Sequence, residues 1–216
     1  MKRLVIFDLD GTLVNSSEDI CDNINKTLVK FGYPEISLAE TVRFVGNGAR
    51  KLVERALKGE KAENFGEILD FYNNSYNYCG SPKSRAYKGV KELMKKLREE
   101  GYLLAVLSNK PQSGTDEVIG KFFPDVYPDC VFGQREGVKT KPDGEGVRLI
   151  LKELGVKKEE AVFVGDGETD ARTYINAGID GISVLWGFRG RDELINAGAT
   201  SFAETPEDLY EKIKKF

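Results

Sequence analysis

The sequence predicts an α/β fold, and two observations lead to that prediction. Short, unbroken apolar runs recur along the chain, and amphipathic helical stretches lie between most of them. Runs rich in Val, Ile and Leu suit strands buried on both faces. Alternation of strand and helix indicates a Rossmann-like, doubly wound and mainly parallel sheet with right-handed crossovers. The expected strands are LVIF at 4–7, YLLAVL at 102–107, CVF at 130–132, AVFV at 161–164, ISVLW at 182–186 and TSFA at 200–203.

Three of the stretches between these runs carry helix signals. The segment 89–101 places its apolar residues on one stripe and ends at Gly101, a favourable residue after a helix. The segment 145–155 has the same pattern. The segment 205–216 begins with Thr205 as an N-cap and Pro206 at the first helical position. We therefore expect a helix in each.

Residues 15–82 interrupt the alternation, because no strand pattern follows Val14 over that stretch. Apolar residues recur there at helical spacing, Ser37 and Glu40 form a capping box, and 63–79 suits a further helix. We predict an inserted small α-helical cap domain over 15–82, with the catalytic core formed by 1–14 and 83–216. Held by two crossings of the chain, the cap could move as a lid.

Composition narrows the classes of function. The chain has 216 residues, of which 40% are apolar and 31% charged, with a net charge of −3. That balance gives no electrostatic reason to expect nucleic acid or an anionic membrane as a partner. There is no hydrophobic signal region and no apolar stretch of about 18 residues, so a cytoplasmic location is expected. A monomer and a homodimer are both compatible with the sequence.

The chain contains no histidine, and its three cysteines lie far apart. Ser-His-Asp, Cys-His and His-metal chemistry are therefore excluded, and neither a disulfide framework nor a zinc site is expected. Catalysis has to come from carboxylates, hydroxyls, lysine or a bound ion.

Polar residues follow three of the predicted strands. DLD ends the first, SNK occupies 108–110, and GDGETD occupies 165–170. Each alone fits an ordinary turn or helix cap. Because ligands bind at the carboxyl ends of strands in doubly wound sheets, the three together predict one site. The side chains expected to converge are Asp8, Asp10, Ser108, Asp166 and Asp170.

Carboxylates gathered in one crevice require a cation. An all-oxygen ligand set without histidine or thiolate suits Mg²⁺, with Asp8, Asp10, Asp166 and Asp170 as candidate ligands. Mg²⁺ keeps several waters and readily takes a phosphate oxygen, so a small phosphorylated metabolite is the expected substrate.

Phosphoryl transfer assigns roles to the residues around the ion. Asp8 can act as nucleophile, and Asp10 can protonate the leaving oxygen and later deprotonate a water. Thr12 and Ser108 can donate hydrogen bonds to phosphoryl oxygens. A lysine is also needed. Lys141 is favoured over its neighbour Lys139, because a turn that opens the next helix follows it.

In order and spacing these segments resemble the haloacid dehalogenase-like superfamily of phosphohydrolases. DLDGT resembles its first motif, Ser108 with Asn109 the second, Lys141 with the following proline the third, and GDGETD the fourth. The resemblance implies a Rossmann-like core, Mg²⁺, a nucleophilic Asp8, and an Asp10 that is both acid/base and, through its backbone carbonyl, a metal ligand. It also implies Asp166 as a direct ligand.

The same resemblance leaves Asp170 either a direct ligand or a partner of the ligands. The helical insertion resembles the small cap of the family. Asp10 fits phosphatases and phosphomutases, whereas dehalogenases lack an aspartate there, and Thr12 favours a phosphatase.

Within the superfamily, the segments 41–57, 183–190 and 197–209 resemble phosphoglycolate phosphatases. In the cap, backbone amides of the loop could bind a small anion with help from an arginine, although a plain helix–helix turn is equally compatible. The residues concerned are Gly46, Asn47 and Gly48 of the loop, and Arg43 or Arg50. Gly144 and Gly167 depart from the usual motif residues, proline and serine.

The leading hypothesis is thus a Mg²⁺-dependent phosphatase of a small phosphomonoester, with 2-phosphoglycolate as the first candidate. A sugar-phosphate mutase similar to β-phosphoglucomutase and a pyrophosphatase are alternatives within the same chemistry. A receiver-like Mg²⁺-binding module is the non-enzymatic alternative, but such a module needs neither Asp10 nor a cap.

Overall fold

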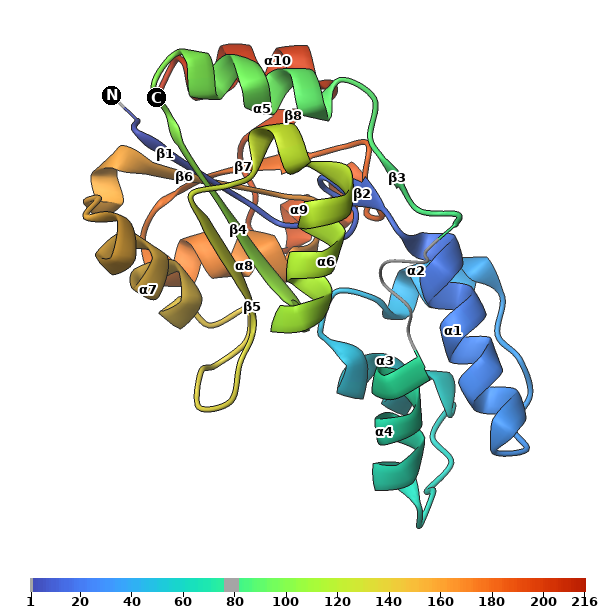
Figure 1. Ribbon diagram of the computed structural model, residues 1–216. Coiled ribbons are helices and arrows are strands. Elements are labelled where there is room, and N and C mark those ends of the chain that lie inside the picture. Colours follow the sequence, from blue (N-terminus) through green and yellow to red (C-terminus); the bar gives the residue numbers. More distant parts are fainter. Residues whose placement is uncertain (1, 76–81) are drawn as a thin grey trace.

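The computed structural model describes residues 2–75 and 82–216 (Figure 1). Its main sheet has six strands in the order β5-β4-β1-β6-β7-β8, and every neighbouring pair is parallel. The predicted doubly wound parallel sheet is therefore confirmed. Chain order reverses at β1, which lies between β4 and β6, so the crevice for a ligand is expected there. The strands are β1 (Leu4–Phe7), β4 (Leu103–Pro111), β5 (Cys130–Gln134), β6 (Ala161–Gly165), β7 (Asp180–Val184) and β8 (Phe202–Ala203).

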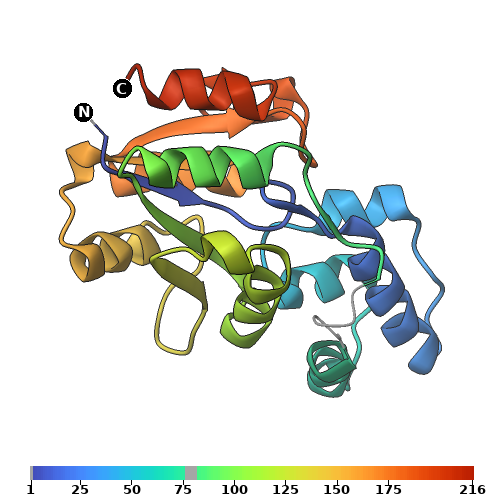
Figure 2. The same ribbon diagram turned by 45° about the horizontal axis from the view of Figure 1, so that its top comes forward.

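Helices cover both faces of this sheet (Figures 1 and 2). One face packs against α5 (Val90–Glu99), α6 (Gln112–Phe122) and α10 (Pro206–Ile213), and the other against α7 (Glu145–Leu154), α8 (Glu168–Ala177) and α9 (Arg191–Asn196). Alternate residues of β1 enter the two cores, because successive strand side chains point to opposite faces. All four are buried, which explains the unbroken apolar run at 4–7.

The helix signals in the core were informative. Helices α5, α7 and α10 form where they were predicted. Gly101 follows α5 with a φ of 86°, and Gly155 ends α7 in the left-handed region. The Thr205 hydroxyl accepts a hydrogen bond from the backbone N–H of Asp208, which confirms the N-cap of α10.

Between the short strands β2 (Val14–Asn15) and β3 (Arg85–Ala86), which pair antiparallel, the described chain forms four helices. We call them the helical segment: α1 (Ser17–Lys30), α2 (Leu38–Phe44), α3 (Ala49–Ala56) and α4 (Phe65–Ser75). They share a hydrophobic core of their own. The two short strands were not predicted, whereas the capping box of Ser37 and Glu40 is confirmed. Residues 76–79 of the helix expected over 63–79 lie outside the described residues. The boundaries of a separate cap domain stay a prediction.

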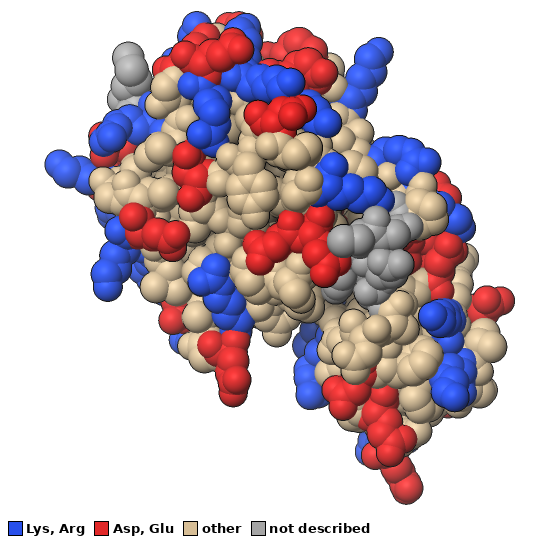
Figure 3. Space-filling view, in the orientation of Figure 1, with Lys and Arg blue, Asp and Glu red and all other residues tan. Residues whose placement is uncertain are grey.

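The surface carries both charge signs. On the face that Figure 3 shows, Lys and Arg are interspersed with Asp and Glu over both the sheet-bearing part and the helical segment. Among the described residues, no helix combines the length and the apolar character needed to cross a bilayer.

Candidate active site

Three aspartates that are remote in sequence meet at the carboxyl ends of β1 and β6. Asp8 directly follows β1, Asp166 directly follows β6, and Asp170 lies in the first turn of α8. Each offers a carboxylate oxygen within 4.8 Å of the others, and all three side chains are buried. The parallel pairing of β1 with β6 sets this proximity, since the backbone N–H of Asp8 donates to the carbonyl of Val164 over 2.8 Å.

Lys141 lies against this cluster. Its Nζ is 2.6 Å from Oδ1 of Asp8 and 2.6 Å from Oδ1 of Asp170, and 3% of its side chain is exposed. The competing Lys139 is 75% exposed and pairs with Asp143 at 3.6 Å. Of the two lysines that the sequence offered, Lys141 therefore lies in the site.

One lysine does not balance the charge of three carboxylates. Burial and the charge of Asp170 raise the pKa of Asp8 well above its usual range, although Lys141 opposes the shift. Burial and Asp170 also raise the pKa of Asp166 to about 7. Burial would lower the pKa of Lys141, but Asp170 and Asp8 outweigh it and the pKa is raised. The cluster thus carries an excess of negative charge that a cation would relieve.

Asp166 is held from several sides. One oxygen accepts from the Thr12 hydroxyl over 3.1 Å and the other from the backbone N–H of Phe188 over 2.7 Å. Glycines make room for it: a Cβ on Gly11 would lie 2.3 Å from Asp166 Oδ2, and one on Gly187 would lie 2.2 Å from Asp166 Cβ. The Thr12 hydroxyl therefore orients Asp166 in this structure, and its predicted donation to a phosphoryl oxygen stays a prediction.

Asp10 lies beside the cluster rather than in it. Its carboxylate accepts from the Ser16 hydroxyl over 2.5 Å and pairs with Nζ of Lys110 at 2.9 Å. It does not belong to the group of described carboxylates that could share an ion. Metal binding through its backbone carbonyl, which the family resemblance implied, stays a prediction. The ionic contact with Lys110 fixes the direction of the Asp10 side chain.

The second motif reaches both the lysine and the helical segment. Asn109 Nδ2 donates to the carbonyls of Gly46 at 3.1 Å and Lys141 at 3.0 Å, and its Oδ1 accepts from the backbone N–H of Lys141 over 2.8 Å. The Ser108 hydroxyl accepts from the backbone N–H of Lys110 over 3.2 Å. Asn109 therefore fixes the backbone that carries Lys141.

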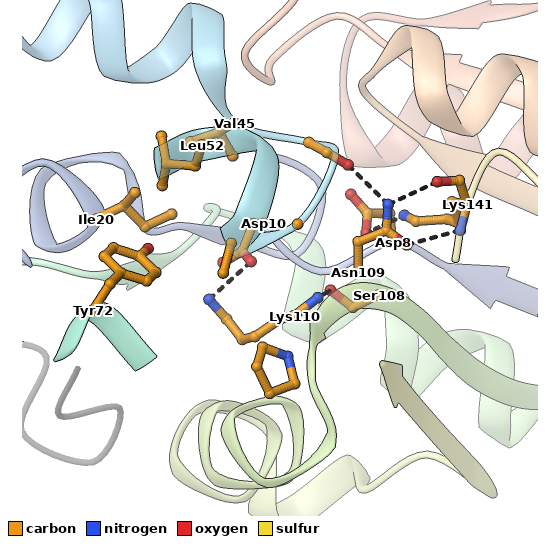
Figure 4. A pocket seen from close by; sticks show the side chains of 14 residues that line it. Asp8, Asp10, Ile20, Val45, Leu52, Tyr72, Ser108, Asn109, Lys110 and Lys141 are labelled. Atoms are coloured by element: carbon orange, nitrogen blue, oxygen red, sulfur yellow. Dashed lines mark hydrogen bonds and ion pairs between the residues drawn. The ribbon is translucent and has the colours of Figure 1, made fainter. Parts of the chain in front are cut away.

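Two cavities meet at Asp8. The larger, of about 70 Å³, is lined on one side by polar residues of the strand ends and on the other by the helical segment (Figure 4). The polar lining comprises Asp8, Asp10, Ser108, Asn109, Lys110 and Lys141, and the apolar lining includes Ile20, Val45, Leu52 and Tyr72. The smaller, of about 20 Å³, is lined by Asp8, Asp10, Asp166 and Asp170 among others. It has room for about one or two water-sized groups, which suits an ion.

The donor set of the smaller cavity fits Mg²⁺. Its titratable lining is chiefly carboxylate, and the described chain offers neither imidazole nor thiolate there. Hard oxygen ligands of this kind favour Mg²⁺ over softer metals.

The predicted residues of the helical segment divide into two groups. Gly46 and Gly48 line the larger cavity. The side chain of Asn47 donates to the Thr169 hydroxyl over 3.0 Å, so it links the segment to α8. Arg43 and Arg50 are both exposed and are not among the residues that line the cavity. Arg50 instead pairs with Glu54 at 3.9 Å. Substrate binding by Arg43 or Arg50 stays a prediction, because neither side chain lines the larger cavity.

Sequence reasoning did not single out two cations of the site. Lys110 directly follows the second motif, a signal that was available but not used. Arg189, in the loop after β7, pairs with Glu168 at 2.9 Å and donates to the carbonyls of Val42 and Val45 in the helical segment. Arg189 lies in the segment 183–190 that resembles phosphoglycolate phosphatases, but that resemblance assigned no role to the arginine.

Two aromatic residues of that loop also contact the site. The indole N–H of Trp186 donates to the carbonyl of Thr12 over 3.0 Å. The ring of Phe188 packs against the core of the helical segment, while its backbone N–H donates to Asp166. Phe188 therefore touches the acidic cluster and the helical segment at once.

Comparisons with known proteins agree with this geometry. The family model of the haloacid dehalogenase-like hydrolases matches residues 5–184. The chain therefore belongs to the haloacid dehalogenase-like hydrolases. Among curated relatives, it is 31% identical to the phosphoglycolate phosphatase of Psychrobacter arcticus, covering 88% of this chain and 87% of that protein.

Solved structures extend the likeness over the whole chain. A structure from Lactobacillus delbrueckii subsp. bulgaricus, provisionally assigned as a phosphoglycolate phosphatase, has a TM-score of 0.91 at 30% identity and covers 99% of each chain. CbbY from Rhodobacter sphaeroides in complex with phosphate has a TM-score of 0.80 at 21% identity and covers 97% of this chain and 96% of its own. At that identity, the second likeness concerns the fold alone.

Proposed function

We propose that the chain is a Mg²⁺-dependent phosphatase that hydrolyses a small phosphomonoester through a phosphoryl group carried on Asp8. The observation that supports this most is the position of Asp8, which borders both the small acidic cavity and the larger pocket. A nucleophile at that boundary can reach a phosphoryl group in the pocket. The similarity to phosphoglycolate phosphatases makes 2-phosphoglycolate the first candidate substrate.

The acidic cluster is the proposed metal site. Asp8 and Asp166 would hold Mg²⁺ with the backbone carbonyl of Asp10, and Asp170 would support them. When bound, Mg²⁺ would supply positive charge against the phosphoryl oxygens. Lys141 adds a second positive charge, which Asp170 and Asn109 keep in place.

The proposed reaction consists of two transfers of the phosphoryl group, first from the ester to Asp8 and then from Asp8 to water. Lys141 holds one oxygen of Asp8, and the other oxygen attacks phosphorus as the bond to the ester oxygen breaks. Asp10, directed by Ser16 and Lys110, gives its proton to the leaving oxygen. Asp10 then takes a proton from the water that attacks the phosphoaspartate, which releases phosphate and restores Asp8.

Replacing the nucleophile tests this proposal. Asp8→Asn should lower phosphate release from both 2-phosphoglycolate and an aryl phosphate by at least about 1,000-fold, because the amide cannot form the acyl phosphate. Asp125→Asn, at an exposed position, is the matched control and should leave the rate unchanged. A folded Asp8→Asn protein that keeps substantial activity would contradict the covalent mechanism.

A further inference from the structure

We propose that Lys110 selects the substrate by binding a carboxylate group on a short phosphate ester. The inference rests on the proposed phosphatase function and names the substrate class for the same pocket. In this arrangement the phosphoryl group lies at Asp8 and Ser108, and the acid group of the substrate lies against the ammonium group of Lys110.

The position of Lys110 supports this assignment. The residue lies near the carboxyl end of β4, two residues after Ser108, and 7% of its side chain is exposed. Figure 4 shows its ammonium group facing Asp10 within the larger pocket, at a distance of 2.9 Å. The ion pair with Asp10 accounts for the burial of this cation, and an ammonium group has three N–H donors with which it can hold more than one acceptor.

The pocket presents its cations at two positions. The described lining contains two cations, Lys110 and Lys141. Lys141 is held between Asp8 and Asp170, at 2.6 Å from each, beside the phosphoryl position. Lys110 lies farther along the pocket, where the wall toward the helical segment is apolar. An acid group that enters this part of the pocket needs a cation, because apolar surroundings cannot compensate its charge.

The pocket is small and is open to solvent on one side. A two-carbon acid phosphate is short enough to place both of its anionic groups among the residues that line it, and a larger ester would extend through the open side. A second phosphate could also pair with a lysine, but it is bulkier than a carboxylate. The pocket therefore favours a carboxylate as the second anion.

A pair of substrates of similar size isolates the contact. 2-Phosphoglycolate carries the carboxylate, and 2-hydroxyethyl phosphate replaces it with a neutral hydroxymethyl group. Lys110→Met should lower kcat/KM for 2-phosphoglycolate about 10- to 150-fold more than for 2-hydroxyethyl phosphate, the range that corresponds to one lost charge-assisted hydrogen bond. Most of the difference should lie in KM. Lys51→Met, at an exposed lysine of α3, is the matched control and should leave the ratio unchanged.

The ratio is the deciding measurement, because Lys110 also contacts Asp10 and its loss can slow both substrates. An equal fall for both would show that Lys110 only positions Asp10 and would overturn the proposal. Hydrolysis of a hexose bisphosphate in preference to 2-phosphoglycolate would overturn the carboxylate assignment.

Binding measurements keep the test independent of turnover. In the Asp8→Asn protein with Mg²⁺, calorimetry should show that Lys110→Met weakens the binding of 2-phosphoglycolate and leaves that of inorganic phosphate nearly unchanged. A wild-type protein that releases phosphate neither from these esters nor from an aryl phosphate would refute the proposed function itself, whereas one that hydrolyses only the aryl phosphate would refute the carboxylate assignment. A wild-type protein that hydrolyses both equally well would leave the phosphatase proposal standing and refute only the role of Lys110.

Discussion

Arg189 and Val45 join the loop after β7 to the helical segment, with Nη2 of the arginine donating to the valine carbonyl over 2.8 Å. Val45 also lines the larger pocket, so this bond holds one wall of the pocket in place. The arginine side chain is 9% exposed, which shields its hydrogen bonds from competing water.

Arg189→Met should therefore loosen the helical segment. We expect a loss of about 1.5–3 kcal/mol in the free energy of unfolding, because bonds from a charged donor to buried carbonyls are lost. Amide exchange should accelerate in α2 and in the loop that carries Val45. Arg191→Met removes only an ion pair with Glu204 whose side chains are 47% and 72% exposed, and it should cost less than about 1 kcal/mol. Unchanged exchange in α2 of the Arg189 variant would contradict this account.

Lys141→Met should destabilise the metal-free protein strongly. Asp8 and Asp170 would lose their common cation, and breaking a buried pair costs about 3–5 kcal/mol. Denaturant unfolding with and without Mg²⁺ measures the effect, and Mg²⁺ should recover part of it. Lys139→Met, at an exposed position, should stay within about 0.5 kcal/mol of wild type. Equal stability of the two variants would refute the charge balance inferred for the cluster.

The affinity for Mg²⁺ should rise with pH, and the rise should continue until the pH exceeds about 7. Asp8 and Asp166 have raised pKa values, about 7 for Asp166, so below that pH protons compete with the ion. Calorimetry in buffers of different ionisation enthalpy should detect proton release on binding near pH 6, and the part of it that comes from Asp166 should be much smaller at pH 8. Absence of proton release at pH 6 would show that the ion does not displace protons from these carboxylates.

The stability of the metal-free protein should show the opposite trend. Because the folded-state pKa of Asp166 exceeds its ordinary value near 3.8, the folded protein binds more protons than the unfolded chain between about pH 4 and 7. This group therefore lowers the free energy of unfolding as the pH rises through that window. Saturating Mg²⁺ should remove the decline, so the rise in Tm on adding Mg²⁺ should be larger at pH 8 than at pH 5.5.

Gly11→Ala should displace Asp166 in the proposed metal site, in addition to straining the backbone at residue 11. Gly11 has a φ of 96°, and a Cβ there would lie 2.3 Å from Asp166 Oδ2. Gly101 has a φ of 86° with no neighbouring atom within 4 Å, so Gly101→Ala carries the same backbone cost of about 1–2 kcal/mol without the clash. We expect Mg²⁺ affinity to fall at least about tenfold in the first variant and to stay unchanged in the second. Equal affinities would mean that Asp166 tolerates displacement or does not bind the ion.

The sheet and the acidic cluster were open to prediction from sequence for a physical reason. Strands buried on both faces must be apolar throughout, so β1 and β6 are visible as unbroken runs. Parallel strands bring their carboxyl ends to one edge, which placed Asp8 and Asp166 together although 158 positions separate them. Lys141 was favoured over Lys139 because a turn that opens the next helix follows it.

The wall formed by the helical segment could not be predicted in the same way. Ile20 and Leu52 have the spacing of ordinary helix-core residues, and only the packing of the segment against the strand ends makes them line a pocket. Arg50 is visible as a cation in a promising motif, yet it pairs with Glu54 and lies over the ring of Phe65 at 5.1 Å. Which way a long side chain turns depends on contacts that a single sequence does not reveal.

Phe188 makes the two halves of the molecule depend on one another. Its backbone N–H donates to an oxygen of Asp166, while its partly buried side chain packs against the hydrophobic core of the helical segment. Thermodynamic linkage is reciprocal. If packing of the helical segment against the strand ends raises the affinity for Mg²⁺ by some factor, Mg²⁺ binding must favour the packed arrangement by the same factor. Adding Mg²⁺ should accordingly slow the exchange of buried amides in α1 and α3. A substrate that brings the helical segment closer to the strand ends should in turn raise the affinity for Mg²⁺.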